Sequence, residues 1–137
     1  MKKKYISWID IDDAVRIIAL KILNSNIKVT NILGIPRGGL IPAVLLSHQL
    51  NVPLLKQGEP PSNTTLVIDD ICDSGNTLKF YDFCPTAAIH YKKSAIHRPT
   101  FYVDEVRENE WQVYPWEKVD SETIQDYLKL EKDDIKL

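Results

Sequence analysis

Two aspartates stand side by side at the end of an apolar run, and a turn rich in hydrogen-bond donors follows them. The segment reads Leu66-Val-Ile-Asp-Asp-Ile-Cys-Asp-Ser-Gly-Asn-Thr77. Adjacent carboxylates repel each other and need hydroxyl groups, a cation or water to stay ionised. Directly downstream, the hydroxyls and backbone N–H groups of residues 74–77 are suited to hold a phosphate dianion. Acids for sugar hydroxyls and Mg²⁺, beside donors for a phosphate, describe a site for a ribose phosphate.

A second loop, Gly34-Ile-Pro-Arg-Gly-Gly39, is also rich in glycine. The chain has five glycines, and those at positions 34, 38, 39 and 75 fall in these two loops. Each loop is expected to leave the carboxyl end of a strand and enter a helix, at the edge where open parallel sheets bind ligands. Glycine there indicates unusual dihedral angles or close backbone approach. Ordinary tight-turn usage is the alternative for the first loop, and a solvated helix cap is the alternative for Asp73 alone.

Hydrophobic periodicity predicts the elements that must position these loops. Helices are expected over about 12–23, 40–50, 77–83 and 121–132, and strands over 29–35, 52–55, 65–68 and 87–91. Alternating strands and helices predict an α/β fold, with a parallel twisted sheet and flanking helices. We expect a single domain over 1–137, with a core over about 10–92 and a small hood or flap over about 93–117.

Composition excludes several classes of protein. The 137 residues are 44% hydrophobic and 26% charged, and 17 basic against 19 acidic side chains give a formal net charge of −2. This balance gives no general electrostatic reason to bind nucleic acid or an anionic membrane, so neither is expected as a partner. No apolar run approaches the roughly 20 residues of a membrane span. Cys72 and Cys84 are too few for a disulfide framework, so free thiols in a cytoplasmic protein are expected.

The segment Leu66–Thr77 resembles the signature with which type I phosphoribosyltransferases bind 5-phosphoribosyl 1-pyrophosphate (PRPP). That signature is an apolar strand, two acids, two apolar residues, Asp, Ser or Thr, Gly, any residue and Thr. Ile35–Leu40 is similar to the pyrophosphate loop of the family, and Tyr5–Leu23 and Trp111–Glu117 are similar to its xanthine–guanine and hypoxanthine branch. The resemblance implies the type I phosphoribosyltransferase fold. It also implies transfer of the phosphoribosyl group to a 6-oxopurine (guanine, xanthine or hypoxanthine) in purine salvage.

Matched position by position, the resemblance implies how the sugar phosphate binds. Asp69 and Asp70 would bind the ribose 2′- and 3′-hydroxyls, with Asp70 nearest a Mg²⁺ cofactor, and Asp73 would handle the proton at N7 of the purine. The 5′-phosphate would be held by Asp73, Ser74, Gly75, Asn76 and Thr77. Arg37 and the Gly38 amide would take the pyrophosphate, and the family often has a non-proline cis peptide in that loop, here the bond before Arg37.

The resemblance also implies a base site. Lys92 would donate to the purine 6-oxo group, with Lys93 as the alternative, and either lysine could instead be a solvated charge at the end of a strand. Trp111 would stack on the base, with a core aromatic as the alternative, and backbone oxygens around Trp111 and Gln112 would read the 2-position of the base. Three further expectations concern other side chains. Trp116 is read as a core aromatic, Glu117 as an acid near Mg²⁺ or at the surface, and His48, His90 and His97 as structural or exposed.

One segment departs from the family pattern. Relatives have a longer, flexible segment that carries a Ser-Tyr pair and closes over PRPP. Here only Lys56–Thr65 connects two predicted strands, with two prolines and no tyrosine. The alternatives are therefore a regulator of the same fold that senses PRPP or nucleotides, or a phosphoribosyltransferase for another base. Self-association as a homodimer or homotetramer is expected by analogy with the family.

Overall fold

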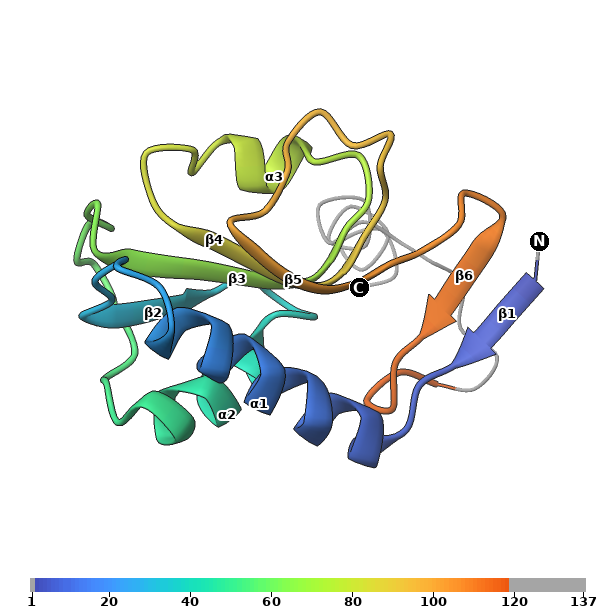
Figure 1. The fold of residues 1–137 in the computed structure, drawn as a ribbon, viewed down its shortest axis with the longest axis horizontal. Coiled ribbons are helices and arrows are strands. Elements are labelled where there is room, and N and C mark those ends of the chain that lie inside the picture. The colour runs from blue at the N-terminus through green and yellow to red at the C-terminus, as the bar shows by residue number, and fades with distance from the viewer. Residues whose placement is uncertain (1, 119–137) are drawn as a thin grey trace, which may run out of the picture.

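The structure is a computed structural model that describes residues 2–118 (Figure 1). Its elements are β1 (Lys2–Tyr5), α1 (Trp8–Leu23), β2 (Asn31–Gly34), α2 (Leu40–Leu50), β3 (Thr65–Cys72), α3 (Asn76–Lys79), β4 (Thr86–Tyr91), β5 (Phe101–Glu105) and β6 (Glu110–Val113). Four strands form a parallel sheet in the order β2-β3-β4-β5, and β1 pairs with β6 in a separate parallel sheet. The predicted α/β class is confirmed. The predicted helix over 121–132 lies outside the described residues.

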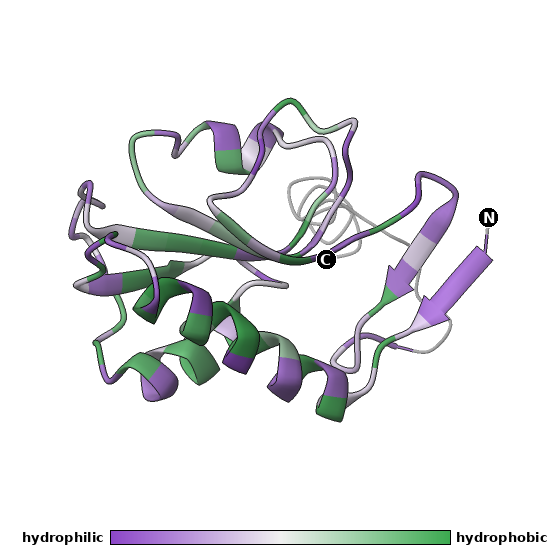
Figure 2. Ribbon diagram, in the orientation of Figure 1, coloured by the Kyte–Doolittle hydropathy of each residue, from purple (hydrophilic) through white to green (hydrophobic). Residues whose placement is uncertain are grey.

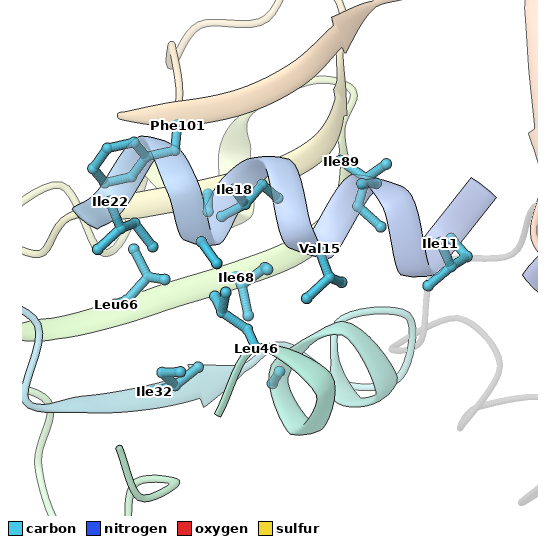
Figure 3. Close-up of a cluster of buried hydrophobic side chains, with 14 of the residues drawn as sticks. Ile11, Val15, Ile18, Ile22, Ile32, Leu46, Leu66, Ile68, Ile89 and Phe101 are labelled. Atoms are coloured by element: carbon cyan, nitrogen blue, oxygen red, sulfur yellow. The ribbon is translucent and has the colours of Figure 1, made fainter. Parts of the chain in front are cut away.

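The main core lies between the four-stranded sheet and the helices α1 and α2 (Figure 3). Helix α1 packs against β4 and β5, and α2 packs against β2 and β3. Ile18 of α1, Leu46 of α2 and Ile68 of β3 are fully buried there. A smaller cluster that includes Val67 and Leu78 lies on the other face, beneath α3. Because both faces are covered, β3 is apolar along most of its length (Figure 2).

Helix α1 begins at Trp8, four residues before its predicted start, because a capping box holds its first turn. The Asp10 N–H donates to the Ser7 side chain at 3.0 Å, and the Ser7 N–H donates to the Asp10 carboxylate at 2.9 Å. These hydrogen bonds hold the pKa of Asp10 below its usual value. The apolar stripe faces the sheet as the periodicity predicts, through Ile11, Val15, Ile18 and Ile22 (Figure 3). The predicted bounds of α2 are confirmed.

Strand β3 continues to Cys72, four residues beyond its predicted end at Ile68, so both adjacent aspartates lie within the strand. Strict alternation would place Ile68 and Cys72 on one face of the sheet. Instead, Ile68 lies in the core under α1 and α2, and Cys72 lies in the cluster under α3. The side chains therefore change phase over residues 69–71. The predicted strand ended too early because the two adjacent acids, Asp69 and Asp70, interrupt the apolar run.

Two short elements differ from the prediction. The strand expected over 52–55 forms only one bridge, between Leu54 and Ile32, because Pro53 has no N–H to donate to a ladder. The helix expected over 77–83 ends at Lys79, and the chain continues in turns. Phe80 is 75% exposed, so this stretch lacks the apolar contacts that would extend a helix.

The segment expected as a hood divides between the two sheets. β5 pairs in parallel with β4, and the side chain of Phe101 is buried in the main core. β6 pairs with β1, apart from the main sheet (Figure 1). The main sheet therefore extends beyond residue 92, where the core was expected to end, and includes β5 as an edge strand. No helix among residues 2–118 has the length and apolar character needed to cross a bilayer.

Candidate functional site

The two adjacent aspartates of β3 are tied to the backbone. The Asp70 N–H donates to Asp69 Oδ1 at 2.8 Å, and the Ile71 N–H donates to Asp70 Oδ1 at 2.7 Å. Burial raises the pKa of Asp70 to about 6, and the negative charge of Glu117 acts in the same direction. A carboxylate that burial disfavours in its charged form gains from a cation or from hydroxyl donors brought by a ligand.

The glycine loop between β2 and α2 lies directly against this acid. A Cβ atom built on Gly38 would lie 2.0 Å from Asp70 Oδ2, so only glycine allows the loop backbone to approach the carboxylate so closely. The Pro36–Arg37 peptide bond is cis, at the position that the family resemblance indicated. The fold thus brings the loop of Arg37 and Gly38 to the acid pair, from two different strand–helix connections.

The donor-rich turn after β3 is supported from behind by residues 96 and 97. Gly75 has φ +86°, and a Cβ there would lie 2.8 Å from the backbone nitrogen of His97. The Ile96 N–H donates to the carbonyl of Ser74 at 2.9 Å. The side chains of Ser74 and residues 76–77 remain exposed. The turn therefore has a fixed backbone and leaves its hydroxyl groups open to solvent.

Lys92, directly after β4, meets the acid of this turn. Its Nζ lies 3.1 Å from Asp73 Oδ1, and its side chain is only 9% exposed, against 50% for Asp73. The Lys92 N–H also donates to the carbonyl of Cys72 at 3.1 Å. Lys93 is exposed. Of the two lysines, Lys92 is thus the one that the fold places beside residues 69–77, which we call the acid turn.

Trp111 and Gln112 lie on β6, beside β1. Trp111 is half-buried, and the ammonium of Lys3 lies 5.2 Å from the centre of its ring. Gln112 is buried, its Nε2 donates to Glu110 Oε2 at 3.4 Å, and its Oε1 has no partner within residues 2–118. Because side chains alternate along a strand, Trp111 and Gln112 point to opposite faces. Gln112 can reach a ligand on the Trp111 face only through its backbone.

Sequence reasoning missed a buried pair beside the acid turn, Tyr114 and His90. The Tyr114 hydroxyl lies 2.8 Å from His90 Nδ1 and 3.3 Å from the backbone carbonyl oxygen of Asp70. Burial lowers the pKa of His90 to about 4, so the imidazole is neutral at neutral pH. Burial also raises the pKa of Tyr114 well above its usual value. His90 lies on β4 and Tyr114 follows β6, and no local pattern in the sequence links them.

Several secondary candidates now have defined surroundings. The ring of Trp116 stacks on Tyr114 with centroids 5.1 Å apart, which confirms Trp116 as a core aromatic. Glu117 Oε1 accepts a hydrogen bond from the Tyr114 N–H at 2.9 Å. His97 Nε2 lies 2.9 Å from Thr86 Oγ1, as expected of a structural histidine, and His48 is exposed. Within residues 2–118, no group of three His, Cys, Asp or Glu side chains could hold a metal ion by itself.

The acid turn is an open polar edge, and two hollows of the described chain lie elsewhere. One of about 210 Å³ lies between α1 and β4, and one of about 370 Å³ lies beside β2 and α2. Neither is lined by residues 69–77. We place the site at the turn because a phosphorylated ligand needs charged groups and N–H donors more than an apolar enclosure.

Known proteins resemble this chain in both sequence and fold, although no family model matches it. A xanthine-guanine phosphoribosyltransferase from Cereibacter sphaeroides is 27% identical over 113 residues, which cover 63% of this chain and 68% of the relative. One from Idiomarina loihiensis is 24% identical over 139 residues, 82% of this chain and 86% of the relative. The solved purine phosphoribosyltransferase of Pyrococcus horikoshii has a TM-score of 0.75 and 28% identity, over 90% of this chain and 100% of that one.

The chain is thus similar in sequence and fold to known purine phosphoribosyltransferases. It has their fold, a parallel sheet with flanking helices. In this phosphoribosyltransferase fold, the glycine loop of Gly38 follows β2. The acid pair lies near the end of β3, the neighbouring strand, and the donor-rich turn follows β3. Lys92 follows β4, the next strand of the sheet. The carboxyl ends of three adjacent parallel strands thus supply the candidate site.

Proposed function

We propose that the chain transfers the 5-phosphoribosyl group of PRPP to a 6-oxopurine, which yields the nucleoside 5′-monophosphate and pyrophosphate. The observation that carries this proposal is the ion pair of Lys92 and Asp73 beside the acid turn, with Nζ and Oδ1 3.1 Å apart. A 6-oxopurine carries an acceptor, O6, next to a donor, the N7–H. An ammonium beside a carboxylate complements that edge, because Lys92 donates to O6 and Asp73 accepts from N7.

The sugar phosphate lies between the two loops in this proposal. Asp69 and Asp70 bind the ribose 2′- and 3′-hydroxyls, and Asp73, Ser74, Gly75, Asn76 and Thr77 hold the 5′-phosphate. Arg37 and the Gly38 N–H bind the pyrophosphate. The close approach of Gly38 to Asp70 supports this arrangement, because the pyrophosphate of PRPP is attached next to the carbon that bears the 2′-hydroxyl.

A Mg²⁺ ion fits the acid pair when it arrives with PRPP. Asp70 is the proposed ligand, because burial disfavours its charge and a cation would offset that cost. The described residues supply no cage of three ligating side chains, and Mg²⁺ typically keeps several waters and takes substrate phosphate oxygens as ligands. When bound, the ion neutralises charge on the pyrophosphate.

The protein positions the two substrates and stabilises the charge that develops in the reaction. The bond from the sugar C1 to the pyrophosphate breaks as N9 of the base approaches, and the sugar acquires oxocarbenium character. Arg37 and the Gly38 amide stabilise the negative charge on the departing pyrophosphate. Asp73 accepts the N7 proton, and Trp111 stacks on the base and holds it in line with C1.

The same ion pair predicts selection against adenine. Adenine carries an amino donor at position 6, which would face the donor Lys92 and leave an N–H of the buried ammonium without an acceptor. A site built to hydrogen-bond one partner rejects an analogue that lacks it by up to about 10⁴-fold.

A steady-state assay with PRPP, Mg²⁺ and hypoxanthine, guanine, xanthine or adenine tests the proposal. We expect turnover of at least one 6-oxopurine, with kcat/KM at least about 100-fold lower for adenine. The same assay is extended to pyrimidines and nicotinamide, and turnover of these bases alone would reassign the base that the chain uses. No turnover of any base would refute the enzymatic proposal.

Size-exclusion chromatography with light scattering tests the proposed homodimer or homotetramer.

A further inference from the structure

The segment that carries the base-stacking Trp111 is fastened to the acid turn through one side chain. Tyr114 directly follows β6, and its hydroxyl lies 3.3 Å from the backbone carbonyl oxygen of Asp70 on β3. Tyr114 is only 3% exposed. The strand β6 is hydrogen-bonded to β1 and not to the main sheet, so this contact bridges the two sheets.

The protons of this contact can be assigned from the partners. Both contacts are hydrogen bonds in one arrangement only, in which the single Tyr114 proton goes to the carbonyl oxygen of Asp70, because a carbonyl oxygen only accepts. The Tyr114 oxygen must then accept from His90 Nδ1, 2.8 Å away, and that nitrogen must carry the hydrogen. His90 lies on β4 and is 5% exposed. If its ring turned away, the buried Tyr114 oxygen would lose its donor. The chain of bonds thus runs from β4 through Tyr114 to the backbone of Asp70.

The same residue also fixes the segment after β6. The Tyr114 N–H donates to Glu117 Oε1 at 2.9 Å, and Trp116 stacks on the Tyr114 ring with an interplanar angle of 3°. Glu117 is near enough to Asp70 for its charge to act on that carboxyl. Tyr114 therefore lies at the centre of the segment from Trp111 to Glu117.

We propose that Tyr114, held by His90, is a positioning residue that sets the base-stacking segment in register with the acid turn. This inference rests on the function proposed above. Neither residue touches substrate in this arrangement. The hydroxyl ties the Trp111 segment to the backbone of Asp70, and β3 itself remains held by its ladders to β2 and β4. Loss of the hydroxyl should loosen the base site while leaving the loops that hold PRPP in place.

The test is a comparison of steady-state constants for Tyr114→Phe and the wild-type chain. We expect the KM for the purine to rise about tenfold, with the KM for PRPP within about twofold of wild type. A merely structural role would lower the folded fraction and hence the apparent kcat, without moving the KM for the purine. Tyr102→Phe is the matched control, because Tyr102 also has a hydrogen-bonded hydroxyl but lies on β5 and contacts Arg98 and Glu105.

Two further variants keep the test decisive if Tyr114→Phe does not fold. His90→Asn retains a nitrogen donor near the position of Nδ1, and we expect a KM for the purine within about threefold of wild type. His90→Leu removes the donor, and it should reproduce the roughly tenfold rise. Unchanged purine KM in His90→Leu, or equal rises in both KM values, would overturn the positioning role alone. Absence of turnover by the wild-type chain would overturn the proposed function and this inference with it.

Discussion

Among single residues, Asp70 is the one at which the needs of folding and of ligand binding oppose each other. Its folded-state pKa of about 6 exceeds the value of 3.8 for a free aspartate, because burial disfavours the charge. The folded chain therefore binds this proton more tightly than the unfolded chain does. Stability conferred by the protonated form is present below about pH 4 and is lost as the pH rises through about 6.

The variant Asp70→Asn tests this opposition. At about pH 7.5 without ligand, its free energy of unfolding should exceed that of wild type by up to about 3 kcal/mol, because the amide stays neutral. At about pH 4 the difference should nearly vanish, and phosphoribosyl transfer should be lost at either pH. Urea unfolding at both pH values measures this, with Asp82→Asn, an exposed aspartate, as the control. A variant less stable than wild type at the higher pH would contradict the assignment.

Lys92 and Lys93 form a natural pair for a test of base recognition. Lys92 is buried against Asp73, whereas Lys93 is exposed. Lys92→Gln should lower kcat/KM for the preferred 6-oxopurine by about 100-fold or more, and it should lower selection against adenine. Lys93→Gln should remain within about twofold of wild type. Equal losses in the two variants would show that charge near the turn, and not the ion pair, is what matters.

At the scale of the elements, the candidate site depends on how closely the β2–α2 loop approaches strand β3. Gly38 lies between β2 and α2, and its Cα lies against the Asp70 carboxylate, where a Cβ would come within 2.0 Å of Oδ2. The loop thereby places Arg37 and the backbone amides beside the acid pair without a side chain between them. The phase change over residues 69–71 of β3 has a complementary effect, because it places Cys72 in the cluster under α3, the helix that begins in the donor-rich turn.

Gly38→Ala should therefore separate the loop from β3. We expect a fall in kcat/KM of about 100-fold, since small displacements of positioning groups have effects of that size. Gly58→Ala is the comparison: Gly58 has φ +83° and open space around it, so alanine there should cost about 1 kcal/mol of stability and leave turnover unchanged. Kinetics and urea unfolding of both variants distinguish loss of the site from loss of stability. Full activity in Gly38→Ala would contradict the proposed role of this contact.

The sequence predicted elements whose pattern is local and missed contacts that are not. Helix α2 and the glycine and acid loops follow from residues adjacent in the chain. The last four residues of β3 were missed because two adjacent acids interrupt the apolar run that predicted the strand. β5 was missed because its residues gain burial only when paired with β4. The contact between Tyr114, which follows β6, and His90 of β4 was missed because these two distant residues meet only in the folded chain.

In the whole molecule, the order β2-β3-β4-β5 brings separate pieces of sequence to one edge. The loops that follow β2 and β3 and the lysine that follows β4 meet there, while β1 and β6 form a second, smaller sheet that carries Trp111 (Figure 1). In the proposed function the main sheet carries the sugar-phosphate residues together with Lys92 and Asp73, and the smaller sheet carries the stacking Trp111. The main sheet is the larger and is buried on both faces, which suits a rigid support for the sugar-phosphate site.

Isothermal titration calorimetry of the chain with PRPP and with guanosine 5′-monophosphate, in the presence of Mg²⁺, tests most directly whether this edge binds a phosphoribosyl group. We predict measurable heat with one site per chain for at least one of the two, and its loss in Thr77→Val combined with Ser74→Ala, which removes two hydroxyls from the donor-rich turn. Binding undiminished in that double variant would move the phosphate elsewhere. No heat from either ligand with the wild-type chain would contradict the central claim.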